Sequence, residues 1–386
     1  MTVHIGRLDS KSAQKPMTKI LQIGNYPPPA CGWAVQTKLL TEEIRRRGHI
    51  CDVLNINESR KIKSSEYVDV QNGFDYVLKL FRFAFRGYRF QVNVNGQSKP
   101  GYVLAALALL VGRMVARPAT LSWRGGLQQK YFPREDSRSI RLAYRLLFQL
   151  AGKISCDSGP VKRAIESYGI PAERIVAIPP FSKQNIAFQA APLSEATESF
   201  LQRSDPVFFC YVSFRPEYEL PMLRLAMASF REEFPRAGFV WLGFPSKEMP
   251  AVRQYVSEWS KSEREGLLLL GNLNHDQFLT LLSRCTAYLR TPMCDGVAAS
   301  VLEALAIGIP VVASDNGTRP SGVLTYRDRD VADLCGKLKI LLETYPDVKA
   351  QTRLDHADDN IDLTVDWLLG GSAGPQECGV ELAHVR

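Results

Sequence analysis

The sequence predicts an α/β protein with two domains, each built around a parallel sheet. Its 386 residues are too many for one comfortable hydrophobic core and are ordinary for two domains. Short apolar runs that stop at glycine or proline alternate with stretches of helical spacing, which is typical of parallel strands covered by helices. A polar, irregular segment separates two such series. We therefore expect domains at 17–185 and 206–352, joined by an irregular linker at 186–205.

The first domain begins with a βαβ unit. An apolar run at 19–24 ends in Gly24, a Pro-rich loop and a helical stretch follow, and a second apolar run covers 50–54. The loop after Gly24 reads Asn-Tyr-Pro-Pro-Pro and lacks the Gly-x-Gly-x-x-Gly of dinucleotide-binding enzymes. A dehydrogenase is therefore not favoured.

A later strand of this domain, at 118–123, leads into a loop that contains Arg124, Gly125 and Gly126. Arg124 stands at the carboxyl end of that strand, the edge where open α/β sheets bind ligands. Two interpretations stay open. The guanidinium faces a ligand, or it is bound to a neighbouring acid or solvated.

Two helices predicted in the first domain are unusually basic. A helix is expected over 76–90, and its cations recur at spacings of three and four residues, which places them on one face. These cations are Lys79, Arg82, Arg86 and Arg89, and a second stripe begins with Arg138, Arg141 and Arg145. With a formal net charge of +8, such faces suit an anionic membrane surface, although a solvated helix face explains them equally well. Nucleic acid is not expected as a partner, because no recognised nucleic-acid module accompanies the charge.

The second domain repeats the alternation of strands and helices. The expected strands cover 207–213, 239–243 and 267–273. A helix is expected at 331–342, and we interpret the preceding Asp328-Arg329-Asp330 as its cap rather than as a metal site.

The most informative segment of the chain runs from Asp295 to Glu303, two acids with seven residues between them. An apolar helix follows, ending at Gly308 and Pro310, and then a Val-Val-Ala-Ser-Asp strand. If most of the interval is helical, the two carboxylates lie about 10 Å apart, roughly the reach from the ribose to the sugar of a nucleotide sugar. The amides at the helix start would lie between them, where a diphosphate would bind. Alternatively, Ser300 and Glu303 form a capping box and Glu303 binds no ligand.

This segment resembles the donor-site signature of family 4 retaining glycosyltransferases, which have the two-domain GT-B architecture. The usual form is Glu, seven residues, Glu, an Ala-rich helix and Gly-x-Pro-Val-Val; in this chain the first acid is Asp295. The continuation Arg-Pro-Ser-Gly-Val at 319–323 is similar to a subgroup associated with bacterial surface polysaccharides. The resemblance implies an α/β GT-B fold, two Rossmann-like domains facing each other across a cleft. It also implies that a C-terminal helix at 353–370 packs back on the first domain. The sequence after it, at 371–386, is expected to be a disordered tail.

The resemblance further implies which residues form the site. The donor-binding residues would be Gly32, Arg215, Asn272, Leu273, Gly296, Val297, Ala298 and Glu303, and the catalytic residues Asp295 and Arg124. Glu303 would bind the ribose, Asp295 the sugar and Arg215 the diphosphate. Besides Asp295, two further departures from the family pattern are visible: Trp33 replaces the second glycine of a Gly-Gly pair, and Tyr218 lies where a lysine often follows the arginine. Either another cation, Arg290 or Arg319, would then assist Arg215, or phosphate binding would be weakened.

The expected function is therefore sugar transfer, with retention, from a UDP- or GDP-sugar to a saccharide or polyprenyl-linked acceptor, without a metal or other cofactor. Exopolysaccharide, capsule or O-antigen synthesis is the expected setting. The departures at Trp33, Tyr218 and Asp295 motivate an alternative, a catalytically silent GT-B partner in a polysaccharide assembly complex. A sugar-nucleotide epimerase of related architecture is a third interpretation.

Composition limits the remaining possibilities. The eight cysteines include no Cys-x-x-Cys pair, and the five histidines show no metal-ligand spacing, so a zinc site or a histidine-based triad has little support. The first 20 residues lack the apolar core of a secretory signal, and the longest apolar run, from 102 to 116, is broken by Arg113 and falls short of the roughly 20 residues of a spanning helix. We expect a cytoplasmic protein that can lie on the inner face of the cell membrane.

Overall fold

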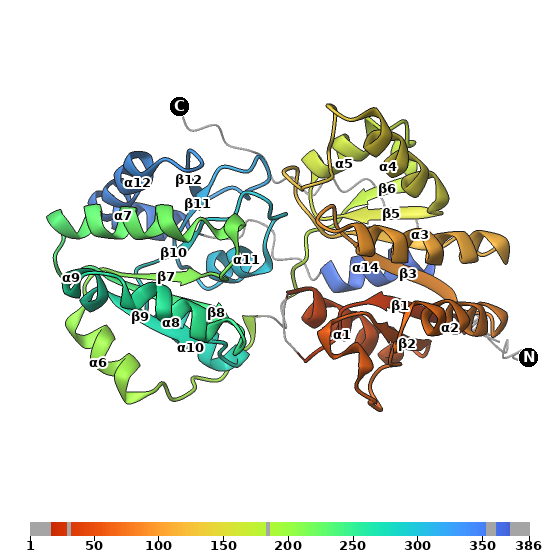
Figure 1. The fold of residues 1–386 in the computed structure, drawn as a ribbon, viewed down its shortest axis with the longest axis horizontal. Coiled ribbons are helices and arrows are strands. Elements are labelled where there is room, and N and C mark those ends of the chain that lie inside the picture. The colour runs from red at the N-terminus through yellow and green to blue at the C-terminus, as the bar shows by residue number, and fades with distance from the viewer. Residues whose placement is uncertain (1–16, 29–31, 183–185, 353–359, 371–386) are drawn as a thin grey trace, which may run out of the picture.

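The computed structural model describes residues 17–28, 32–182, 186–352 and 360–370. These residues form two α/β domains, seen as two lobes in Figure 1. Each domain contains a six-stranded sheet in which all paired neighbours are parallel. The predicted α/β fold with two parallel sheets is confirmed. The expected tail at 371–386 lies outside the described residues.

The first sheet has the strand order β2-β1-β3-β4-β5-β6. Its strands are β1 (Lys19–Gly24), β2 (Ile50–Asn55), β3 (Arg89–Val94), β4 (Thr120–Trp123), β5 (Lys153–Cys156) and β6 (Ile175–Ala177). Its helices are α1 (Gly32–Arg46), α2 (Gly73–Phe85), α3 (Lys99–Met114), α4 (Arg138–Leu150) and α5 (Gly159–Glu166), with short 3-10 turns η1 (Glu58–Lys61) and η2 (Ala172–Arg174). Leu21 and Ile23 of β1 face the core shared with α2, α3 and α4, whereas Ile20 faces α1. Successive side chains of β1 thus point to opposite faces of the sheet, and each face is covered by a different helix layer.

The second sheet has the strand order β12-β11-β10-β7-β8-β9. Its strands are β7 (Val207–Tyr211), β8 (Gly238–Phe244), β9 (Leu267–Gly271), β10 (Ala287–Arg290), β11 (Val311–Ser314) and β12 (Val323–Tyr326). Its helices are α6 (Glu195–Arg203), α7 (Leu220–Glu233), α8 (Met249–Ser257), α9 (Lys261–Glu265), α10 (His275–Ser283), α11 (Ala299–Ala306), α12 (Val331–Glu343) and α13 (Tyr345–Gln351), with the 3-10 turn η4 (Pro216–Tyr218). The side chain of Asp330 accepts a hydrogen bond from the amide of Asp333, which confirms the predicted cap of α12.

One predicted helix is wrong at its carboxyl end. The helix expected over 76–90 ends at Phe85, because Gly87 takes a φ of 87° and turns the chain into β3. Arg89 therefore lies on a strand and not on a basic helix face. Lys79 is held by Asp69 and Asp75, with its Nζ 2.8 Å from an oxygen of Asp75.

The linker expected to be irregular at 186–205 contains the helix α6. Ser194 caps this helix through the amide of Thr197, and Phe200 on it is fully buried against the second sheet. Although the segment is mostly polar, Phe188, Leu193 and Leu201 also pack against the same cluster.

The chain crosses between the domains a second time before its last helix, α14 (Asn360–Leu369). This helix packs on α1 of the first domain through Ile361, Val365 and Leu368 (Figure 1). The two crossings are tied together, because Asn360 donates hydrogen bonds from its amide to the carbonyl of Phe181, at 3.2 Å, and from its side chain to that of Pro179, at 3.0 Å. Residues 353–359 of the predicted last helix lie outside the described residues.

No helix in the described part of the chain is long and apolar enough to cross a bilayer.

Candidate functional site

The candidate site lies where loops at the carboxyl ends of the two sheets meet. The loop after β4 contacts the loop after β10, and the side chain of Gln129 donates a hydrogen bond to the carbonyl of Cys294. At a second point, Lys247 after β8 forms an ion pair with Glu58 after β2. The carboxyl edge of an open parallel sheet is the usual place for a ligand, and here two such edges face each other.

The start of α11 presents free backbone amides. The helix has no side-chain cap, and its N-cap residue Ala298 has a φ of 58°, an unusual conformation for a residue with a side chain. Within the described residues, none of the amides from Gly296 to Ser300 donates a hydrogen bond to the protein. Asn316 and Thr318 instead hold the carbonyl of Gly296. A helix start with open amides is a suitable anion site.

Glu303, on the first turns of α11, is a buried carboxyl group without a partner. It is 8% exposed, and its side chain makes no hydrogen bond or ion pair with any of the described residues. Burial raises its pKa from the usual 4.5 to about 8. The capping box that the sequence left open is not formed, because Ser300 pairs with the hydroxyl of Tyr288 at 2.8 Å. Glu303 is therefore available to a ligand.

Asp295 lies on the loop before α11 and is bound by two buried arginines. Arg290 donates two hydrogen bonds to its carboxylate, at 2.6 and 2.9 Å, and Nη1 of Arg319 lies 3.5 Å from it. The Asp295 side chain retains 16% exposure. Arg290 and Arg319, which the sequence suggested as partners of Arg215 in phosphate binding, are thus engaged with Asp295 in this structure.

Arg124 is buried at the end of β4 and forms an ion pair with Asp157 at 2.8 Å. Of the two interpretations of Arg124, the structure shows the one in which an acid binds it. The pair lies beside the candidate site, since a Cβ built on Gly296 would lie 3.3 Å from an oxygen of Asp157. Asp157 was not singled out in the sequence, although it directly follows a buried strand.

Arg215 is the exposed cation of the second domain's first loop. Its side chain is 55% exposed and lies 3.9 Å from an oxygen of Glu248. Tyr218 on the same loop contacts one of the arginines that bind Asp295, since its ring centre lies 5.4 Å from the guanidinium of Arg290. Arg215 can therefore turn towards an anion beside α11 without breaking a buried contact.

The remaining predicted residues are spread along the two facing edges. Asn272 is exposed and Leu273 half-buried after the edge strand β9, and Leu273 packs in the same apolar cluster as Ala298. Val297 is buried against Phe181 and Leu302. Gly32 is the exposed first residue of α1.

A hollow of about 570 Å³ opens at the carboxyl ends of β1, β2 and β3 in the first domain. Its polar lining is mostly amide side chains, and these are Asn25, Gln71, Asn72, Asn93, Asn95 and Gln97. Trp33, the residue that replaces a glycine of the family pattern, also lines it, together with Arg60 and Lys61. We call this the amide pocket. Its signal in the sequence was the pair Asn93 and Asn95 at the end of β3, which was missed because no strand was predicted there and the helix expected over 76–90 overlapped the first two residues of β3.

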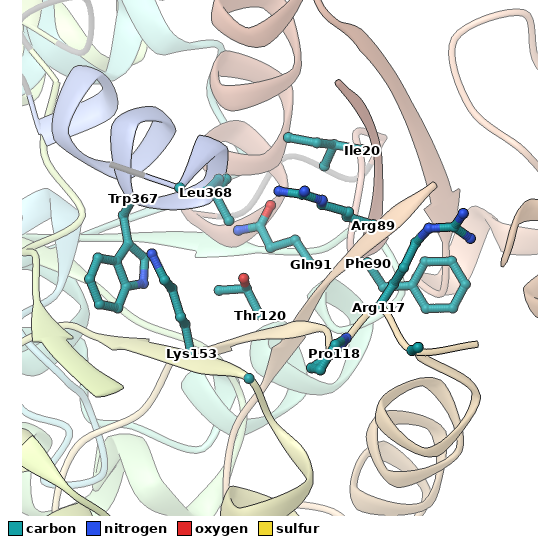
Figure 2. A pocket seen from close by; sticks show the side chains of 13 residues that line it. Ile20, Arg89, Phe90, Gln91, Arg117, Pro118, Thr120, Lys153, Trp367 and Leu368 are labelled. Carbon is teal, nitrogen blue, oxygen red and sulfur yellow. The ribbon is translucent and has the colours of Figure 1, made fainter. Parts of the chain in front are cut away.

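A smaller hollow of about 220 Å³ lies at the opposite edge of the same sheet, at the amino ends of β1, β3, β4 and β5 (Figure 2). There the ammonium group of Lys153 lies 4.3 Å from the ring centre of Trp367 of α14. Being at the amino edge, this hollow is separate from the candidate site.

Within the described residues, no group of three or more histidine, cysteine, aspartate or glutamate side chains is placed to hold a metal ion.

The fold is that of GT-B proteins. Anabaena HepE in complex with UDP has a TM-score of 0.66 at 14% identity, with 91% of this chain and 96% of that chain covered. Sucrose-phosphate synthase from Thermosynechococcus elongatus has a TM-score of 0.64 at 15% identity, covering 91% and 95%. UDP-GlcNAc 2-epimerase from Neisseria meningitidis, bound to UDP-GlcNAc, has a TM-score of 0.61 at 14% identity, covering 91% and 100%. The predicted GT-B class, two Rossmann-like domains, is thereby confirmed.

In sequence, residues 195–328 match the family described as glycosyl transferases group 1. The match covers most of the second domain and includes the segment from Asp295 to Glu303. No curated protein matches the chain. The chain thus combines a GT-B fold with a second domain that is similar to group 1 glycosyl transferases.

Asp295, Arg290 and Arg319 form a buried charged cluster, and removing Arg290 from it is expected to destabilise the second domain. Arg290→Met leaves Asp295 facing Arg319 alone, and loss of one partner of a buried pair costs about 3–5 kcal/mol. The double variant Arg290→Met/Asp295→Asn should not recover this loss, because the buried guanidinium of Arg319 then loses its carboxylate partner. Urea unfolding followed by tryptophan fluorescence measures both.

Arg224→Met is the matched control. Arg224 also donates two hydrogen bonds to one carboxylate, that of Glu263, but its side chain is 31% exposed. We expect a loss below about 1 kcal/mol there. Equal losses at Arg290 and Arg224 would contradict a special role of burial.

Proposed function

We propose that the protein is a retaining, metal-independent glycosyltransferase of family 4 that transfers a sugar from a UDP- or GDP-sugar to a saccharide or polyprenyl-linked acceptor. The observation that carries the proposal is the start of α11, where a row of free amides adjoins a buried carboxyl group without a partner. A nucleotide diphosphate supplies the matching groups, phosphate oxygens for the amides and ribose hydroxyls for Glu303.

In this proposal the second domain binds the donor. The amides from Gly296 to Ser300 and the exposed guanidinium of Arg215 bind the diphosphate, and the backbone near Asn272 and Leu273 contacts the base. Asp295 accepts from a sugar hydroxyl through its exposed edge, while Arg290 holds its carboxylate in place. Gly32, which begins α1 on the opposite domain, faces the phosphates.

The reaction breaks the bond between the anomeric carbon and a diphosphate oxygen and forms a bond from that carbon to an acceptor oxygen. The acceptor's hydroxyl proton leaves with the diphosphate. Negative charge develops on the departing oxygen, and preorganised amides and cations stabilise it without moving. The pair of Arg124 and Asp157 lies where the first domain meets Gly296 of the second domain, and it would orient the sugar.

The amide pocket is the proposed acceptor site. Side-chain amides both donate to and accept from hydroxyl groups, and an indole suits the apolar face of a sugar ring. Arg60 and Lys61 at the same pocket suit an acceptor that carries phosphate. This composition supports a saccharide or a polyprenyl diphosphate saccharide, as in exopolysaccharide, capsule or O-antigen synthesis at the cytoplasmic face of the membrane.

A thermal-shift screen with UDP, GDP and ADP tests the donor site. A bound nucleotide raises the unfolding temperature by mass action, and we expect a rise for the wild type that Glu303→Ala abolishes. Glu258→Ala, an exposed acid of the same domain, is the control and should respond like the wild type. A wild type that responds to no nucleotide would contradict the proposal.

The alternative is a catalytically silent partner, which the engagement of Asp295 by two arginines favours. Incubation with UDP- and GDP-sugars and oligosaccharide acceptors separates the alternatives. A glycosylated product supports the transferase, nucleotide binding without any product supports the silent partner, and an altered sugar nucleotide formed without acceptor identifies an epimerase.

A further inference from the structure

The outer side of the helix layer α2, α3 and α4 carries large apolar side chains that the rest of the described chain leaves exposed. They are Phe74, Leu78 and Phe85 on α2, Val103, Leu110 and Met114 on α3, and Leu142 and Leu146 on α4. These are eight of the thirteen exposed large apolar side chains among the described residues, so the exposure is concentrated on one layer of one domain. Patches of this kind mark interaction sites. We call it the apolar face.

The three helices are neighbours, so the eight side chains lie on the outer side of one helix layer. The hydroxyl of Tyr76 on α2 donates to a carbonyl of α3 at 2.8 Å, and that of Tyr102 on α3 donates to a carbonyl of α4 at 2.8 Å. Arg113 at the end of α3 also donates to the carbonyl of Leu150 at 2.9 Å. Figure 1 shows the three helices following one another across the first domain.

The same helices are strongly cationic. Their sequences contain seven lysines and arginines and a single acid, Asp75, which is bound by Lys79 at 2.8 Å. Arg82, Arg138 and Arg145 are exposed, and no ion pair within the described residues neutralises them. Phe85 additionally stacks on Phe81, with ring centres 6.2 Å apart, which extends the apolar surface beside Arg82.

The combination of exposed apolar side chains and exposed arginines indicates what binds to the apolar face. A second copy bound face to face would bring cations against cations, which is unfavourable. Anionic lipid headgroups neutralise the arginines, and the boundary between headgroups and acyl chains accepts the phenylalanines and leucines. We propose that the apolar face docks the protein on an anionic bilayer surface, with its apolar side chains inserted between the lipids.

Docking in this way also places the amide pocket at the membrane. The pocket is lined by the amino ends of α2 and α3, at Asn72, Gly73, Ser98 and Pro100, so its rim is continuous with the layer that carries the apolar face. Resting on the proposed function, this arrangement favours an acceptor whose saccharide enters the pocket while its lipid stays in the bilayer. The docking itself does not depend on any sugar chemistry.

Flotation with vesicles tests the proposal. The wild type should float with vesicles of phosphatidylcholine and phosphatidylglycerol and far less with phosphatidylcholine alone. Arg82→Gln/Arg138→Gln/Arg145→Gln should weaken the partition by about a hundredfold, at about a fivefold loss per cation near the lipid. Phe85→Ser/Leu142→Ser should weaken it by at least about tenfold, at high salt as well as low, because the apolar contribution is not screened.

The matched control is Leu225→Ser/Ile340→Ser, which removes exposed apolar side chains from α7 and α12 of the second domain and should float like the wild type. Thermal unfolding and the response to nucleotide, measured on every variant, keep a folding defect or a failed donor assignment distinct from a failed docking surface. Flotation that the Phe85 and Leu142 changes leave intact would overturn the proposal. So would a wild type that stays at the bottom of the gradient, or a wild-type dimer that these changes convert to a monomer, which would assign the face to a second copy.

Discussion

Gly126→Ala is expected to hold the two domains apart and to lower transferase activity by about a hundredfold, since misplacement by about 1 Å has an effect of that size. A Cβ on Gly126 would lie 1.8 Å from the carbonyl oxygen of Asp295 and 2.6 Å from its carbonyl carbon. Both are backbone atoms of the other domain, so no side-chain rotation relieves the clash. Gly126 does not have a positive φ, and alanine therefore suits its own backbone.

The spacing of the two domains and the binding of nucleotide can be measured separately. Small-angle scattering should show a larger radius of gyration for Gly126→Ala, while nucleotide affinity, which we propose the second domain supplies, should change little. Gly336→Ala on α12 is the control, because a Cβ there meets no atom within 4 Å. If Gly126→Ala keeps full activity, the contact between the Gly126 and Asp295 loops is not part of the active arrangement.

Nucleotide binding is expected to release a proton from Glu303 near neutral pH. Burial raises the pKa of Glu303 to about 8, so its carboxyl group is mostly protonated at pH 7 in the free protein. Ribose hydroxyls that donate to the carboxylate favour the charged form and lower this pKa. Calorimetric titration with UDP or GDP in buffers of different ionisation enthalpy should show release of up to about one proton per nucleotide.

Glu303→Gln should bind without this proton release and about 10- to 100-fold more weakly, the effect of losing hydrogen bonds to a charged group. Tight binding by the wild type with no proton release would mean that Glu303 does not meet the ribose. Glu258→Gln serves as the exposed control and should release protons as the wild type does.

The same pKa has a consequence for stability. The unfolded chain loses the Glu303 proton near the ordinary pKa of 4.5, whereas the folded protein keeps it up to about pH 8. Between these values the folded state binds more protons, so the free energy of unfolding falls as pH rises, by at most about 1.4 kcal/mol per pH unit from this group. Glu303→Gln should therefore flatten the decline in stability over this range.

The sequence was sufficient to predict the fold and the central segment of the site because both depend on local signals. Glycine and proline mark the ends of most strands, and the run from Asp295 to Glu303 carries its own helix start and stop. The prediction of a helix through residue 90 was wrong because of an equally local signal. Gly87 alone decides whether the helix continues or the chain turns into β3. Asn93 and Asn95 were missed together with the strand that ends there.

Partnerships between distant residues could not be predicted in this way. Arg290 and Asp295 are close in sequence, but Arg319 and Arg124 acquire their partners only when separate strands assemble. The basic stripe of α2 was predicted from spacing, yet its exposed side is shared with Phe74, Leu78 and Phe85. Helical spacing gives the faces of a helix, whereas packing decides which of them meets solvent.

The tie between Asn360 and the carbonyls of Pro179 and Phe181 limits how the molecule can open. Because Phe181 and Asn360 lie beside the two connections between the domains, this tie brings those connections together at one junction. We expect any opening of the domains to be a hinge-like rotation about it. Phe181 also packs on Val297 and Leu302, so we expect such a rotation to shift the start of α11, where the phosphates are proposed to bind.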